Sequence, residues 1–179
     1  MFILYGQVYP FMAETKHLIN NVTLEKSGLV FDFKEFYAHA MDWLKWRGFT
    51  VIETKYVEKV SPEGKNYEIH WMCLKQLDDY SQYKFDIIWK MTGIKDVEAS
   101  IEKSKIPLQK GRIEMNMSSY IEKDIEKKWN KPFVSLFRGF FERFIYRSVM
   151  KKMEIELWGL SWEYHAEIKS FLELYKYTK

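Results

Sequence analysis

Hydrophobic and polar residues alternate along the middle of the chain. From Tyr83 to Met91 every odd position is apolar, and every even position except Ile88 is polar or charged. Side chains of a strand point alternately to its two faces, so this segment predicts a central strand with one apolar and one mostly polar face. The alternation recurs over 67–73 and 113–117, with short connections between, which predicts an antiparallel meander of four or five strands.

The meander has further predicted parts. A first strand is expected over Val22–Phe31 and another over Phe49–Val60, while Gly93 interrupts the alternation and indicates a bulge or a bend. Matching parity across three strands predicts one shared buried face. Its members are Trp71, Phe85, Ile87, Trp89, Ile113 and Met115.

Helical spacing brackets the strands. Asp32 and Glu35 have the spacing of a capping box and Gly48 supplies a stop, which predicts an N-terminal helix between them. From Pro132 the apolar period becomes helical again, with possible breaks at Gly139 and Gly159. The predicted fold is therefore α+β: a curled antiparallel sheet of four to five strands packed against an N-terminal helix and one long bent or two C-terminal helices.

Length and composition favour a single domain over residues 1–179. Residues 1–11 are apolar but lack the features of a signal peptide, and Met12 looks like a natural protein start. We therefore expect 1–11 to be a dispensable N-terminal extension. Cys73 is the single cysteine, which excludes an intrachain disulfide and suits the reducing cytoplasm.

Common catalytic and cofactor motifs are missing from the sequence. The four histidines, His17, His39, His70 and His165, show no i,i+3 or i,i+4 pair, and there is no phosphate-binding loop or nucleophile elbow. We expect no metal and no cofactor, and a non-enzymatic role is favoured over an enzymatic one.

The polar face of the sheet is one candidate site. A carboxylate, a histidine and a cation could together support proton transfer around His70. The alternative, which we favour, is a solvated face whose charges pair across strands. Met72, Leu74 and Ile88 interrupt this face and could form an apolar patch for a partner or for a homodimer. The polar members are Glu68, His70, Asp86, Lys90, Arg112, Glu114 and Asn116.

A second candidate is the segment Lys131–Lys152, which combines basic residues with five phenylalanines. The basic residues expected to bind a partner are Arg138, Arg143, Arg147 and Lys151. Three of them follow at i,i+4 steps on one helix face, which suits an acidic protein or RNA surface better than lipid. In the alternative interpretation the phenylalanines merely cover the sheet and the cations face water.

Function is left between three classes. An interaction protein of unknown partner, using the basic aromatic helix or the apolar sheet patch, comes first. A carrier would hold a small apolar ligand between sheet and helices, in a cavity lined by Trp71, Phe85, Trp89 and Met115. An enzyme would use the polar face around His70.

Several short segments carry a family resemblance. They are Glu35-Phe36-Tyr37, Asp42-Trp43-Leu44 with Gly48, the run 55–60, the run 93–98, and 131–139. In these segments the chain resembles small uncharacterised proteins of uncultured, small-genome archaea, over about Phe33 to the C-terminus. The resemblance implies a cytosolic archaeal protein and carries no catalytic residue or ligand.

Overall fold

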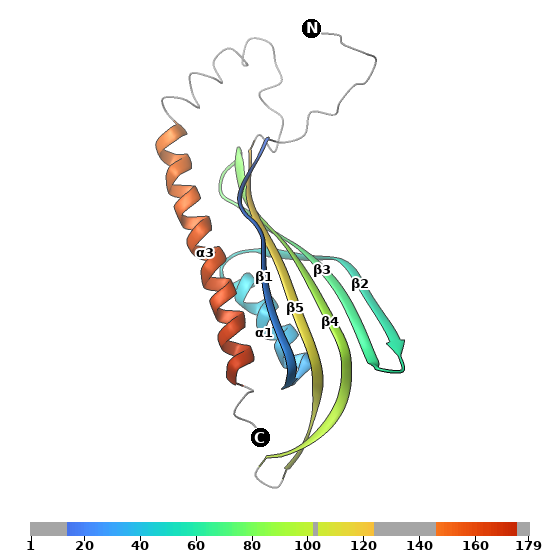
Figure 1. Ribbon diagram of the computed structural model, residues 1–179. Coiled ribbons are helices and arrows are strands. Elements are labelled where there is room, and N and C mark those ends of the chain that lie inside the picture. The colour runs from blue at the N-terminus through green and yellow to red at the C-terminus, as the bar shows by residue number, and fades with distance from the viewer. Residues whose placement is uncertain (1–13, 102–103, 124–145, 175–179) are drawn as a thin grey trace, which may run out of the picture.

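The computed structural model describes residues 14–101, 104–123 and 146–174 of the 179-residue chain. A five-stranded antiparallel sheet curves around two helices that lie on the same side of it (Figure 1). The strands are β1 (Glu14–Phe31), β2 (Thr50–Ser61), β3 (Gly64–Gln76), β4 (Ser81–Ile101) and β5 (Ser104–Lys123), and the helices are α1 (Phe33–Trp46) and α3 (Tyr146–Leu174). The predicted α+β fold is thereby confirmed.

The sheet order is β1-β5-β4-β3-β2, so the first strand pairs with the last. Strands β2 to β5 form the predicted meander, and α1 carries the chain from one edge of the sheet to the other. The sequence prediction for β1 was too short, because the strand begins at Glu14 instead of Val22 and pairs with β5 up to Lys123. Register shifts between His17 and Val22 break its alternation, which hid this half of the strand from the periodicity.

The predicted bulge at Gly93 is confirmed. The register between β4 and β5 shifts between Thr92 and Lys95, and Gly93 has φ 63°, a conformation that favours glycine. Its N–H donates to Oδ1 of Asn66 at 2.9 Å, which ties the bulge to β3.

The ends of α1 follow the local sequence. Asp32 caps its start, accepting a hydrogen bond from the N–H of Glu35 at 2.9 Å. At the other end Gly48 has φ 85°, and the N–H of Phe49 donates to the carbonyl of Leu44 at 3.0 Å. The face between these caps buries Phe36, Ala40 and Leu44.

Helix α3 runs without a break through Gly159, so the break considered there does not occur. Gly139, and the part of the predicted C-terminal helix over 132–145, lie outside the described residues, as do residues 1–11. Within the described ranges, no helix combines the length and apolarity needed to cross a membrane.

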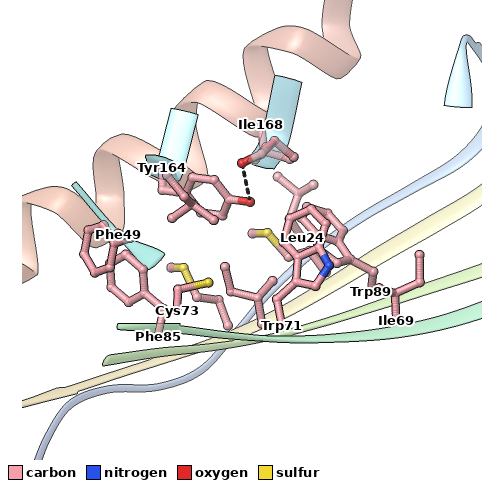
Figure 2. Packing of buried hydrophobic residues seen from close by; sticks show 14 of the residues in the cluster. Leu24, Phe49, Ile69, Trp71, Cys73, Phe85, Trp89, Tyr164 and Ile168 are labelled. Carbon is pink, nitrogen blue, oxygen red and sulfur yellow. Dashed lines mark hydrogen bonds between the residues drawn. The ribbon is translucent and has the colours of Figure 1, made fainter. Parts of the chain in front are cut away.

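The core lies between the concave face of the sheet and the two helices (Figure 2). All six residues predicted to share one buried face are buried, so the parity across β3, β4 and β5 is confirmed. Aromatic rings dominate this core. Trp89 contacts Phe36 of α1 edge-to-face at 5.1 Å between centroids, and Trp71 at 5.8 Å.

Candidate interaction face on the C-terminal helix

The inner side of α3 is apolar and closes the core. Leu157, Tyr164 and Ile168 are fully buried against the sheet and α1. The hydroxyl of Tyr164 donates to the backbone carbonyl of Ala40 at 3.4 Å (Figure 2). These contacts fix which side of the helix faces inward, and therefore which side is left for solvent or a partner.

A second row of residues runs along the outward-facing side of α3. Its members follow one another at steps of three or four residues, so they share one side of the helix. We call it the outer row: Arg147, Lys151, Ile155, Trp158, Trp162, His165 and Lys169. It spans about 33 Å at the usual helical rise of 1.5 Å per residue.

The middle of the outer row is apolar and exposed. Ile155 is 73% exposed, Trp158 55% and Trp162 39%. The two indoles contact each other with ring centroids 6.1 Å apart, and Trp162 contacts the imidazole of His165 at 5.6 Å. The other side of α3 already closes the core, so these side chains are not needed to cover the sheet. Large apolar side chains grouped at the surface are typical of a docking site.

Every glutamate of α3 pairs with a residue of another part of the fold. Each pairs with a cation or histidine of another element, at N···O distances from 2.5 to 3.8 Å. The pairs are Glu154 with Lys16, Glu156 with Lys75, Glu163 with Arg47, Glu167 with His39 and Glu173 with Lys26. The acids of α3 therefore fasten the helix to β1, β3 and α1.

The cations of α3, unlike its glutamates, are not paired within the described ranges. Arg147, Lys151 and Lys169 of the outer row, together with the neighbouring Lys152, are exposed. None of these four makes an ion pair with any residue in the described ranges. The outer row therefore presents unneutralised positive charge at both ends of an apolar centre.

His165 adds no charge to the row near pH 7. Burial, and then the positive charge of Lys169, lowers the pKa of His165 below its usual value. The imidazole is therefore neutral at pH 7 and becomes cationic only in more acidic solution.

The outer row contains part of the predicted basic site. Arg147 and Lys151 lie on it as the i,i+4 spacing required, whereas Arg138 and Arg143 lie outside the described residues. Sequence reasoning missed Ile155, Trp158 and Trp162. These residues form a second apolar series at helical spacing beside the one over Leu157–Leu172. A helix that covers a sheet needs only one apolar face, so the second series was a signal for an exposed apolar face.

Side chains on the polar face of the sheet pair with one another, both between neighbouring strands and within a strand. Arg112 lies 2.9 Å from Glu25 and 3.8 Å from Glu114, and Thr23 donates to Asn116 at 2.7 Å. On the same face Asp86 accepts a hydrogen bond from Tyr120 and lies 3.6 Å from Lys84.

His70 belongs to one of these clusters. Its Nε2 lies 2.8 Å from Oε1 of Glu68, and Nζ of Lys55 lies 2.7 Å from the same oxygen. Hydrogen bonds from Lys55 and then from His70 lower the pKa of Glu68. The two neighbours thus favour the ionised form of Glu68, and a carboxylate whose pKa is lowered is a weaker proton acceptor. The apolar interruptions Met72, Leu74 and Ile88 are half-buried on this face.

The residues expected to line a ligand cavity belong to the packed core. Trp71, Phe85, Trp89 and Met115 are at most 2% exposed. Nε1 of Trp89 is buried and has no hydrogen-bond partner among the described residues.

Two hollows occur elsewhere. One, of about 330 Å³, lies where α1 begins and is lined by Phe33, Tyr67, Ile94 and charged residues including Lys34 and Asp96. Another, of about 380 Å³, lies over β2–β4 beside Glu68 and Lys90. Neither contains one of the four predicted lining residues.

Metal ligands and reactive groups give no stronger candidate. Within the described ranges, no group of three or more His, Cys, Asp or Glu side chains is placed to hold a metal. Cys73 is buried, and burial followed by the charge of Asp86 raises the pKa of its thiol to about 12, so it is a poor nucleophile.

Comparison with known proteins gives no relative. No protein-family model matches the chain, and no curated protein and no solved structure is significantly similar to it. The resemblance to archaeal proteins therefore stays a prediction.

Proposed function

We propose that this chain is a non-enzymatic binding protein that docks an anionic partner on the outer row of α3. The observation that carries the proposal is the contrast between the charges of this helix. All five of its glutamates pair with other elements of the fold, whereas its described cations pair with none. Folding therefore uses the acids, and it leaves the cations beside Trp158 and Trp162 available to a partner.

The arrangement has an energetic cost without a partner. Arg147 and Lys151 stand at i,i+4 spacing, where like charges repel by a few tenths of a kcal/mol. The exposed indoles and Ile155 add apolar surface in contact with water. An interface that combines an apolar centre with charged ends makes use of both features.

A second copy of the chain fits the outer row poorly. Cations occur at both ends of the row, Arg147 and Lys151 at one and Lys169 at the other. Two antiparallel rows would place Arg147 opposite the second Lys169, and two parallel rows would place each cation opposite itself. Like charges so placed disfavour association, and the partner should instead carry negative charge. Acidic protein surfaces, RNA and anionic lipid all meet that condition.

The test is capture of partners from a native extract, including its membranes, by the tagged chain at low and high salt. In the variant Arg147→Glu/Lys151→Glu we expect salt-sensitive capture to be lost while the melting temperature is nearly unchanged. The matched control is Lys95→Glu/Lys110→Glu, which reverses two exposed cations that face each other across β4 and β5. The proposal fails if the α3 variant captures the same partners as the wild-type chain, or if the control loses them equally.

A further inference from the structure

We infer that the partner of the outer row is the surface of a lipid bilayer containing anionic lipid. This inference rests on the proposed function and names its partner class. It differs from the sequence-based preference for RNA or acidic protein, and the difference comes from the outer row itself, which the sequence did not reveal.

The shape of the site is the first argument. Among the described elements, helix α3 lies at one flank of the sheet (Figure 1), and the members of the outer row follow one another along one side of this helix. A flat surface can therefore contact the row along its whole length.

The chemistry of the row is the second argument. Tryptophan is enriched where a bilayer meets water, because its indole has an apolar body and a polar N–H. Arginine and lysine have apolar stems that lie along acyl chains while their charged ends contact lipid phosphates. Arg147, Lys151 and Lys169 alongside Ile155 and the two indoles give this combination on one side of one helix.

The geometry of the indoles argues against RNA. Proteins that hold single-stranded RNA stack successive bases on the faces of aromatic rings. Trp158 and Trp162 lie edge-to-face, with 63° between their planes, and Trp162 and His165 lie at 72°. Neighbouring rings that contact each other in this way do not offer a series of parallel faces to a run of bases.

Each cation near an anionic bilayer surface strengthens binding by about fivefold. Removing two cations therefore weakens binding about 25-fold, and two charge reversals, which also add repulsion from the anionic surface, predict a loss of about 100-fold or more. Binding of the wild-type chain should also fall steeply as salt is added, because the Debye length falls from about 10 Å at 0.1 M ionic strength to about 3 Å at 1 M.

The experiment is flotation of the full chain with two vesicle preparations. One is pure phosphatidylcholine, and the other contains 30% phosphatidylglycerol (about one lipid in three, enough for a surface charge). We expect binding only to the second, lost in Trp158→Ala/Trp162→Ala and in Arg147→Glu/Lys151→Glu. Lys169→Glu, at the far end of the row, is an independent variant that should weaken binding by about tenfold or more.

Two matched controls should bind like the wild-type chain. Lys95→Glu/Lys110→Glu carries the same charge change on the sheet. Trp46→Ala removes an indole at the end of α1 that is 76% exposed. This indole lies against Arg47, which pairs with Glu163 of α3, and Glu163 is not part of the outer row.

The inference is overturned if the chain binds neither preparation, if it binds both equally, or if the tryptophan variant binds unchanged. It is also overturned if a uridine 20-mer binds more tightly than the vesicles and competes with them. Should the vesicles fail while partner capture still depends on Arg147 and Lys151, the partner is an acidic protein or RNA and the proposed function stands. If both assays fail, the proposed function fails with the inference.

Discussion

Arg47 and Glu163 join the end of α1 to the middle of α3. Nη2 of Arg47 lies 2.7 Å from Oε2 of Glu163, and the guanidinium also lies over the rings of Trp43 and Trp46, at 5.0 and 4.8 Å. The same arginine caps the C-terminal end of α1. This side chain is thus one of the contacts that join the two helices, beside the bond from Tyr164 to Ala40 and the pair of His39 with Glu167.

Removing Arg47 should destabilise the domain modestly. We expect Arg47→Ala to cost about 1 kcal/mol, since the ion pair is partly exposed and the aromatic contacts contribute comparably. For a domain of this size that lowers the melting temperature by about 2–4 °C. A double-mutant cycle with Glu163→Gln, followed by urea unfolding, should give a coupling of about 0.2–1 kcal/mol. No coupling would mean that the pair adds nothing to the contact between the helices.

Two tryptophans should differ sharply on truncation. Trp89 is 1% exposed in the core, so Trp89→Ala should cost about 3–5 kcal/mol, a large part of the stability of an ordinary domain. Trp158→Ala, at an exposed indole, should cost less than about 1 kcal/mol. Urea unfolding of both variants measures the difference.

A milder change at Trp89 separates packing from hydrogen bonding. Nε1 of Trp89 has no hydrogen-bond partner in the part of the chain that the structure describes, so Trp89→Phe removes a buried unsatisfied donor while keeping an aromatic ring. It should cost much less than Trp89→Ala. If Trp89→Phe and Trp89→Ala lost equal stability, a smaller aromatic ring could not replace any of the packing of the indole.

Alanine at Gly159 should stabilise α3. The glycine lies inside a continuous helix, and an added Cβ would meet nothing within 4 Å. Because alanine restricts the unfolded chain and favours helix, Gly159→Ala should add about 1 kcal/mol to the free energy of unfolding. The contrasting variant is Gly64→Ala, whose Cβ would lie 2.7 Å from the carbonyl oxygen of Ile94 at a φ of +130°, and which should destabilise. A loss of stability at Gly159 would indicate that the helix is not continuous there.

His165 should make stability depend on pH below neutrality. Its pKa is lower in the folded chain than the ordinary value of about 6.5 expected on unfolding. As the pH falls through that value the unfolded chain takes up a proton first, so stability decreases, and the decrease ends below the folded pKa. Urea unfolding between pH 5 and 8 should show a smaller acid loss in His165→Gln. An identical pH dependence in the two chains would contradict the shift.

Much of the fold was available from local patterns. Alternation over Tyr83–Met91 predicted the central strand and its buried face, because a strand has a period of two and a slip of one residue would expose Trp89. The ends of α1 were predicted as well, since Asp32 and Gly48 act on backbone groups a few residues away. Order in the meander followed from short connections, which let consecutive strands pair.

Other features depended on residues far apart in the chain. Pairing of β1 with β5 brings Glu14 beside Lys123, and no local pattern encodes that contact. The candidate site is decided at the same level. From sequence alone, α3 has two apolar series at helical spacing and a mixture of acids and cations. Only the packed structure shows that Leu157 and Tyr164 face inward while Trp158 is left outside with Lys151. It also shows that three glutamates of α3 pair with Lys16, Lys26 and Arg47. Burial and charge pairing are properties of the assembled elements rather than of the helix.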